Sequence, residues 1–265
     1  MTGSGVSESR LGVPDVGLAG LAEALGAARD IARCVEIPVL ADADTGYGNA
    51  VNVYFTVQAF EQAGVAGLMI EDQTWPKRCG HLAGKELIPA EEMVGKVAAA
   101  VDARSSEDFV VMARTDAAAS LGVDAAVERA NLYAAAGADL LFADALMTDG
   151  DIARFAEGTV GPVAVNMGFG VRSRSTTPLL SAARLQELGV AVMIAPRMLT
   201  AAAVRGMELA LEALNESIRT GEVADRDDLL VSFEELHDLM GFSEIQELES
   251  RFLAREQLAL KYGRG

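Results

Sequence analysis

The chain has 265 residues, of which 51% are hydrophobic, so it can bury a full core as one large domain or two smaller ones. Its formal net charge of −17 argues against binding to nucleic acid or to an anionic membrane. No apolar run reaches the length of a membrane span, the first residues carry no signal-peptide core, and two cysteines form no disulfide framework. We therefore expect a reduced, cytoplasmic protein.

Short aliphatic runs alternate with amphipathic helices along most of the chain. Residues 1–16 are rich in glycine and serine and are expected to form a loop, followed by a helix over 19–34. The expected strands are 37–41, 67–70, 109–113, 140–143, 163–165 and 190–194, and the helices between them fall near 50–63, 90–103, 122–136, 149–157 and 179–188. Near-continuous apolar strands that alternate with helices predict a parallel sheet covered by helices.

Polar residues directly follow at least four of these strands, and they are Asp42 with Asp44, Glu71 with Asp72, Arg114 with Asp116, and Asn166. Functional side chains at the C-terminal ends of many strands are typical of a (β/α)8 barrel of the TIM type. Such a barrel needs eight strands and the sequence supplies six, with the shortfall at the front. We therefore expect either that two strands precede Met1 in the natural protein, so that the first strand and helix are absent here, or that the sheet is not closed.

The pattern changes after the last strand. A long helix is expected over 198–219, an acidic linker over 222–228, and two further helices over 231–240 and 243–262. Ile245, Leu248 and Phe252 form an apolar stripe on the last of these. We expect a catalytic barrel domain at 1–220 and a helical extension at 221–265 that contacts a neighbouring subunit.

Two aspartates lie where the strand 37–41 gives way to a glycine-containing turn, Asp42-Ala43-Asp44-Thr45-Gly46. Alternate residues of a strand face opposite sides, but at a strand end, where the backbone turns, both acids can reach one site. Mg²⁺ is typically held by one or two carboxylates together with water and substrate oxygens. The sequence therefore predicts a metal site here, although acids in this position also cap turns and helices.

The connection between the strand 67–70 and the helix near 90 is unusually long, and loops of this kind are often lids or binding loops. It contains the only tryptophan, Trp75, and the run Lys77-Arg78-Cys79-Gly80-His81. Neighbouring cations favour a thiolate, so the pKa of Cys79 is expected to be lowered. The alternative interpretation is that Cys79 is an inert small hydrophobic residue.

The segments ADADTGYGN, IEDQ, KRCGH and ARTDA occur in this order, and together they resemble the isocitrate lyase / phosphoenolpyruvate mutase superfamily, in particular its 2-methylisocitrate lyase-like branch. The resemblance covers nearly the whole chain, including TGSGVSESRLGVPD near the start. It implies a (β/α)8 barrel, a Mg²⁺ cofactor with Mn²⁺ as the alternative ion, and a homotetramer built from dimers that exchange a C-terminal helix. In relatives, TGSG-like residues lie at the end of the second strand.

The resemblance also implies roles for individual residues. The metal ligands are expected to be Asp42 and Asp44, with Glu71 holding metal-bound water and Asp15 close to the metal. The expected catalytic residues are Cys79 as the proton donor, His81 as its support, Arg114 and Asp15. The substrate-binding residues implied by the resemblance are Thr2, Gly3, Ser4, Lys77, Arg78 and Asn166.

These roles indicate a Mg²⁺-dependent carbon–carbon lyase that acts through an enolate on a small anionic 2-hydroxy or 2-oxo di- or tricarboxylate resembling 2-methylisocitrate. The alternatives are a phosphonomutase of the phosphoenolpyruvate or carboxyphosphonoenolpyruvate type, an oxaloacetate decarboxylase or hydrolase, and a non-catalytic member kept for assembly. A basic loop at 171–178 is either a solvated turn or a specificity loop for a further carboxylate or phosphoryl group.

Overall fold

A computed structural model describes residues 1–80, 82, 84–172, 177–223 and 225–263. The chain divides into two compact units, Met1–Ala201 and Ala202–Gly265, which are described separately below. Among the helices of the described residues, none is both long enough and apolar enough to cross a bilayer.

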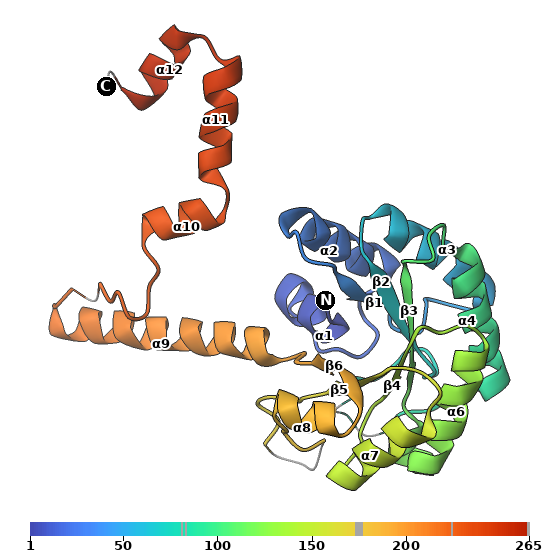
Figure 1. Cartoon of the computed structure of the whole chain (residues 1–265). Helices are drawn as coiled ribbons and strands as arrows, with labels where there is room; N and C mark the ends of the chain where they lie inside the picture. The colour runs from blue at the N-terminus through green and yellow to red at the C-terminus, as the bar shows by residue number, and fades with distance from the viewer. Residues whose placement is uncertain (81, 83, 173–176, 224, 264–265) are drawn as a thin grey trace. The chain divides into compact units, whose positions relative to one another are not determined.

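The first unit is built on a parallel sheet of six strands in sequence order (Figure 1). The strands are β1 (Leu40–Asp42), β2 (Gly67–Glu71), β3 (Val110–Thr115), β4 (Leu140–Ala143), β5 (Val163–Asn166) and β6 (Val190–Ile194). Each strand pairs in parallel with the next, with Glu71 opposite Arg114 in the β2–β3 register. The predicted parallel sheet and its TIM-like architecture are therefore confirmed, as an open half-barrel of six strands.

The free edge of β1 is continued by the first residue of the chain. The Met1 amino group donates to Leu40 O at 2.7 Å, and Asp42 N–H donates to Met1 O at 3.1 Å. This is the bonding pattern of one residue of a parallel neighbouring strand.

The prediction of a loop over 1–16 was wrong, because its first part is helical. α1 (Gly3–Val6) is followed by a π-helical turn, η1 (Ser7–Leu11). Thr2 caps the start of α1 by accepting the Gly5 N–H on its hydroxyl oxygen at 3.1 Å. A second correction concerns β1, which begins at Leu40 rather than at 37, since Ile37 is 72% exposed.

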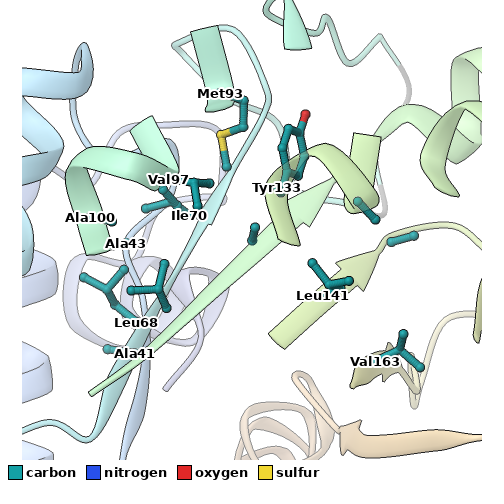
Figure 2. Packing of buried hydrophobic residues seen from close by; sticks show 14 of the residues in the cluster. Ala41, Ala43, Leu68, Ile70, Met93, Val97, Ala100, Tyr133, Leu141 and Val163 are labelled. Carbon is teal, nitrogen blue, oxygen red and sulfur yellow. The ribbon is translucent and has the colours of Figure 1, made fainter. Parts of the chain in front are cut away.

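One further helix precedes the sheet, and six helices of the described residues connect its strands. They are α2 (Leu21–Cys34), α3 (Ala50–Gln62), α4 (Ala90–Ala103), α5 (Ala117–Leu121), α6 (Val123–Ala135), α7 (Asp149–Gly158) and α8 (Ala182–Glu187). The main core lies between these helices and the strands, and Figure 2 shows Leu68 and Ile70 of β2 facing Val97 of α4. Met69 and Met112, which alternate with these positions, belong to a second apolar cluster. Alternation along each strand thus separates an outer core from an inner one.

The second unit consists of helices that bury no residue. α9 (Met198–Thr220) begins in the first unit, and α10 (Phe233–Leu239), α11 (Phe242–Phe252) and α12 (Arg255–Tyr262) follow it. The helix predicted over 243–262 is thus two helices. Large apolar side chains remain exposed on all four, including Phe233, Leu239 and Phe252.

Candidate active site

Polar side chains from the C-terminal ends of the strands meet at one cavity of about 570 Å³. Asp42 ends β1, Arg114 lies one residue before the end of β3, and Asn166 ends β5. The site residues predicted from sequence that line this cavity are Thr2, Ser4, Asp15, Asp42, Lys77, Cys79, Arg114 and Asn166. Parallel strands explain the convergence, because their carboxyl ends all meet at the same edge of the sheet.

The turn after β1 brings Asp42 and Asp44 to the same side. Asp44 has a left-handed backbone with φ of 49°, which is uncommon for a residue with a side chain. Its N–H donates to Asp42 Oδ1 at 2.9 Å, and its carbonyl accepts Glu71 N–H at 2.8 Å. Both carboxylates face Gly3, because a Cβ added there would lie 3.0 Å from Asp42 Oδ2 and 3.0 Å from Asp44 Oδ1. The left-handed backbone at Asp44 thus turns its side chain to the same side as that of Asp42, which the regular alternation of side chains along a strand would not do.

The donor set of these carboxylates is of the kind that would hold a divalent ion through water. Glu71 Oε1 is buried and accepts no hydrogen bond in the described part of the chain, and Asp42 and Asp44 each direct an oxygen at the same point beside Gly3. Within the described residues, no three His, Cys, Asp or Glu side chains gather closely enough to hold one ion directly. Two carboxylates with water in the remaining positions match the usual binding of Mg²⁺.

Lys77 brings a fixed positive charge to these acids. Its Nζ lies 2.6 Å from Asp15 Oδ1 and 2.9 Å from Asp44 Oδ1, and the side chain is only 4% exposed. Burial would lower the pKa of Lys77, but Glu71, Asp42 and Asp44 raise it above its ordinary value. Burial, with a further contribution from Asp42, raises the pKa of Asp44 to about 7. The ammonium therefore stays charged among acids that are costly to ionise together.

Arg114 is held between two acids at the centre of the sheet. Its Nε and Nη2 donate to the two carboxylate oxygens of Asp116 at 2.9 and 2.8 Å, and Nε lies 3.2 Å from Glu71 Oε2. Burial raises the pKa of Glu71 well above its ordinary value, with Arg114 opposing that shift. The bidentate pairing fixes the guanidinium plane at the cavity wall.

Three charged residues of this network were given no role in the sequence analysis. Lys85 Nζ donates to Asp116 Oδ1 at 2.6 Å, to Asp144 Oδ2 at 2.9 Å and to Gly80 O at 3.1 Å. Asp144 directly follows β4, so the rule that identified Asp42 and Glu71 would also have found it. Asn166 Nδ2 approaches Asp144 Oδ1 at 3.4 Å, while Asn166 Oδ1 is buried and accepts no hydrogen bond in the described structure.

The long connection after β2 contributes Lys77, Cys79 and Gly80 to the cavity wall, and its described residues between 72 and 88 are called the flap here. Its two ends pair in antiparallel fashion, since Thr74 N–H donates to Glu86 O at 2.7 Å and Ile88 N–H donates to Asp72 O at 2.9 Å. Near its tip, Cys79 N–H donates to Asp15 O at 3.0 Å. Cys79 is half-buried, so the flap brings the thiol-bearing residue to the cavity.

The other predicted site residues are Gly3, Arg78 and His81. Gly3 N–H donates to Asp42 Oδ2 at 2.8 Å, so α1 contacts the acids through its backbone. Arg78 is exposed and does not belong to the described lining of the cavity. His81 lies outside the described residues, as do residues 173–176 of the basic loop.

A second buried network centres on Asp72, the first residue of the flap, which is fully buried. Its carboxylate accepts hydrogen bonds from Thr115 Oγ1 at 2.7 Å, Asp116 N–H at 2.9 Å, Arg129 Nη1 at 3.0 Å and Tyr133 Oη at 2.7 Å. Burial raises the pKa of Tyr133, so its hydroxyl remains a donor. Asp72 thereby fixes the backbone of Asp116, the residue that orients Arg114.

The chain resembles several known proteins along most of its length. The sequence profile of the phosphoenolpyruvate phosphomutase family matches residues 1–215. The 2,3-dimethylmalate lyase of Eubacterium barkeri is 44% identical over 252 residues, covering 95% of this chain and 85% of the relative.

Solved structures agree with the sequence matches. An oxaloacetate acetylhydrolase in complex with 3,3-difluorooxalacetate aligns with a TM-score of 0.85 at 31% identity, covering 94% of this chain and 83% of that chain. A phosphonopyruvate hydrolase in complex with oxalate and Mg²⁺ aligns with a TM-score of 0.80 at 34% identity, covering 96% and 86%. The chain therefore belongs to the phosphoenolpyruvate mutase/isocitrate lyase superfamily of enzymes.

Proposed function

We propose that this protein is a Mg²⁺-dependent carbon–carbon lyase that cleaves a small 2-hydroxy dicarboxylate or tricarboxylate. The observation that carries the proposal is the meeting of Asp42, Lys77, Cys79 and Arg114 at one cavity. Acids alone would suit many metal enzymes, but a lyase also needs a proton donor at the carbon that departs. Cys79 on the flap is such a donor.

Cleavage leaves negative charge on the departing fragment, and positively charged side chains lie around the cavity. The substrate hydroxyl would give its proton to a carboxylate that lines the cavity, such as Asp15, as a carbonyl forms. The adjacent C–C bond breaks, and its electrons remain on the departing carboxylate fragment as an enolate. Mg²⁺ held by Asp42 and Asp44 would supply Lewis-acid stabilisation of negative oxygen. Arg114 and Lys77 add fixed positive charge that needs no rearrangement during the reaction.

Cys79 completes the reaction by giving its proton to the departing carbon, whose electron pair forms the new C–H bond. The thiolate left behind would be favoured by the positive charge of Lys77, which lines the same cavity. A closed flap also keeps water away from the enolate. Asn166 Oδ1 is buried at the cavity and accepts no hydrogen bond from the described residues, so it is suited to accept one from the substrate.

Phosphonomutase chemistry is the second candidate, and the matching phosphoenolpyruvate phosphomutase profile favours it. It would rearrange a phosphoryl group and would not need Cys79 as an acid. Hydrolysis of oxaloacetate is a third, favoured by the likeness to oxaloacetate acetylhydrolase.

A substrate panel with Mg²⁺ decides among these reactions. The protein is incubated with 2-methylisocitrate, isocitrate, 2,3-dimethylmalate, oxaloacetate and phosphonopyruvate, and release of pyruvate, glyoxylate or oxalate is followed. We expect turnover of a hydroxy acid with release of a 2-oxo acid. Oxalate release from oxaloacetate alone, or turnover of phosphonopyruvate alone, would replace the lyase by one of the other two reactions.

We also propose that the protein assembles as a homotetramer through its second unit. None of the residues of α9–α12 is buried, and the apolar side chains they expose have no covering partner within the described residues of the chain. Exposed apolar surface of this extent is typical of an interface between subunits. Exchange of these helices between two copies would bury it.

A further inference from the structure

Gln73 lies at the base of the flap with its side chain directed inward, only 1% exposed. Its amide group makes two hydrogen bonds with the backbone of one residue near the flap tip. Nε2 donates to Arg78 O at 2.9 Å, and Oε1 accepts Arg78 N–H at 2.9 Å. The side chain therefore pairs with Arg78 as a neighbouring strand would, although the two residues are only five positions apart.

The peptide group that joins Arg78 to Cys79 is held at both of its polar ends. Its carbonyl oxygen accepts from Gln73 Nε2, and its N–H donates to Asp15 O at 3.0 Å. A peptide group is planar, so fixing both ends fixes the rotation of the whole plane. The direction in which the Cys79 side chain leaves the backbone is set by that plane.

We propose that Gln73 is a positioning residue for Cys79, which it holds in place for proton transfer by fixing the Arg78–Cys79 peptide. Both hydrogen bonds of the amide go to the residue that precedes the thiol. The part of this inference that concerns catalysis rests on the proposed lyase function.

Proteolysis tests the positioning without reference to the reaction. Trypsin cleaves after Arg78 only when the segment leaves its hydrogen bonds and binds the protease in an extended form. Gln73→Met keeps the length of the side chain and removes both bonds, while Gln73→Glu keeps an acceptor and loses the donor. Fragment masses over time should show cleavage after Arg78 about tenfold faster in Gln73→Met, as expected for the loss of two hydrogen bonds. Gln186→Met, on the exposed face of α8, is the matched control and should cleave like the wild type.

Kinetics then test the consequence for catalysis. We expect kcat to fall about fivefold to a hundredfold in Gln73→Met and less in Gln73→Glu, because small displacements of a reacting group have effects of this size. KM and the binding of Mg²⁺ with oxalate should stay within about twofold of the wild type, since Gln73 does not belong to the described lining of the cavity. A general loss of structure would lower binding and kcat together and would overturn the proposal.

The proteolysis and the kinetics each have an outcome that would overturn the proposal. Cleavage after Arg78 no faster than in the Gln186→Met control would overturn the proposal, and so would an unchanged kcat in a variant that is cleaved faster. If Gln73→Met does not fold, the same two measurements on Gln73→Glu decide. If the wild type turns over no substrate of the panel, the proposed lyase function fails, and the proteolysis still decides whether Gln73 holds the flap.

Discussion

The ammonium of Lys77 and the carboxylate of Asp44 form a buried ion pair, with Nζ 2.9 Å from Oδ1. The same ammonium lies 2.6 Å from Asp15 Oδ1, so one flap residue joins the loop before α2 to the turn after β1. The position of Lys77 in the flap and the charge of the proposed metal site are therefore physically linked. Removing an acid from this cluster should affect ion binding more than folding.

Asp44→Asn is expected to abolish the response to Mg²⁺ and the catalytic activity together, because the amide keeps the shape of the side chain but not its charge. Binding of an ion to the folded wild type should raise its stability by about 2.7 kcal/mol at a concentration a hundred times the Kd. Thermal unfolding with and without Mg²⁺ measures this response. Asp30→Asn, on the exposed surface of α2, is the control and should retain it. An equal rise in Tm for Asp44→Asn would remove Asp44 from the metal site.

Cys79→Ser is expected to stop C–C cleavage while oxalate still binds in the presence of Mg²⁺. A hydroxyl fills nearly the same space as a thiol but is a far weaker acid, so only the proton transfer should fail. Calorimetry measures oxalate binding, and release of the 2-oxo acid measures cleavage. Cys34→Ser provides the control, since Cys34 is exposed on α2 and should be replaceable without effect. Cleavage at the wild-type rate in Cys79→Ser would assign the acid role to another group.

Gly80→Ala is expected to lower kcat about tenfold or more by lifting the flap. A Cβ on residue 80 would lie 2.5 Å from Asp144 Oδ2 and 2.7 Å from Arg114 Nη2, and both of these side chains are buried. Misplacement of the flap by about 1 Å is enough for an effect of this size. Steady-state kinetics with the preferred substrate measures it.

Gly95→Ala is the matched control for that substitution. Gly95 lies within α4, and nothing lies within 4 Å of the position that its Cβ would take. Alanine in a helix interior should raise the free energy of unfolding by about 0.5–1 kcal/mol and leave kcat unchanged. Equal kinetics for both variants would show that Gly80 tolerates a side chain.

The convergence of Asp42, Arg114 and Asn166 on one cavity could be predicted because each follows an apolar run at the end of a parallel strand. That rule needs only local sequence. Gln73 and Lys85 could not be found in this way, because neither stands at a strand end and each owes its role to contacts that only the folded flap creates. Lys85, for example, meets Asp144 across 59 positions of the chain.

For the first residues of the chain, local composition predicted the wrong secondary structure. Glycine and serine favour a loop on average, yet Thr2 caps α1, and Met1 pairs with Leu40 and Asp42 of β1. Pairing with a distant strand outweighed the local preference. The resemblance to a family gave Thr2 a role in substrate binding, but composition alone gave no sign of the helix.

Tyr133→Phe is expected to lower the free energy of unfolding by about 1.5–3 kcal/mol, the usual range for a hydrogen bond to a charged group. The Tyr133 hydroxyl donates to Asp72 at 2.7 Å, and both residues are fully buried. Urea unfolding should show a lower midpoint at an unchanged slope. Tyr262→Phe, at an exposed position in α12, should change the midpoint little. Equal midpoints for Tyr133→Phe and the wild type would mean that Arg129 and Thr115 satisfy Asp72 without it.

Phe252→Asp is expected to shift the protein from a tetramer to smaller species. Phe252 ends α11 and is 74% exposed in the single chain, as a residue that inserts into another subunit would be. Loss of one buried apolar side chain of this size is worth about 1.5–3 kcal/mol, so the dissociation constant should rise about tenfold to a hundredfold. Light scattering after gel filtration at several concentrations measures the mass.

Glu244→Gln, also exposed on α11, should leave the assembly intact, because it changes a charge without adding one to an apolar face. A wild type that is monomeric at micromolar concentration would overturn the proposed assembly, whereas a tetramer unaffected by Phe252→Asp would move the interface to another face of these helices.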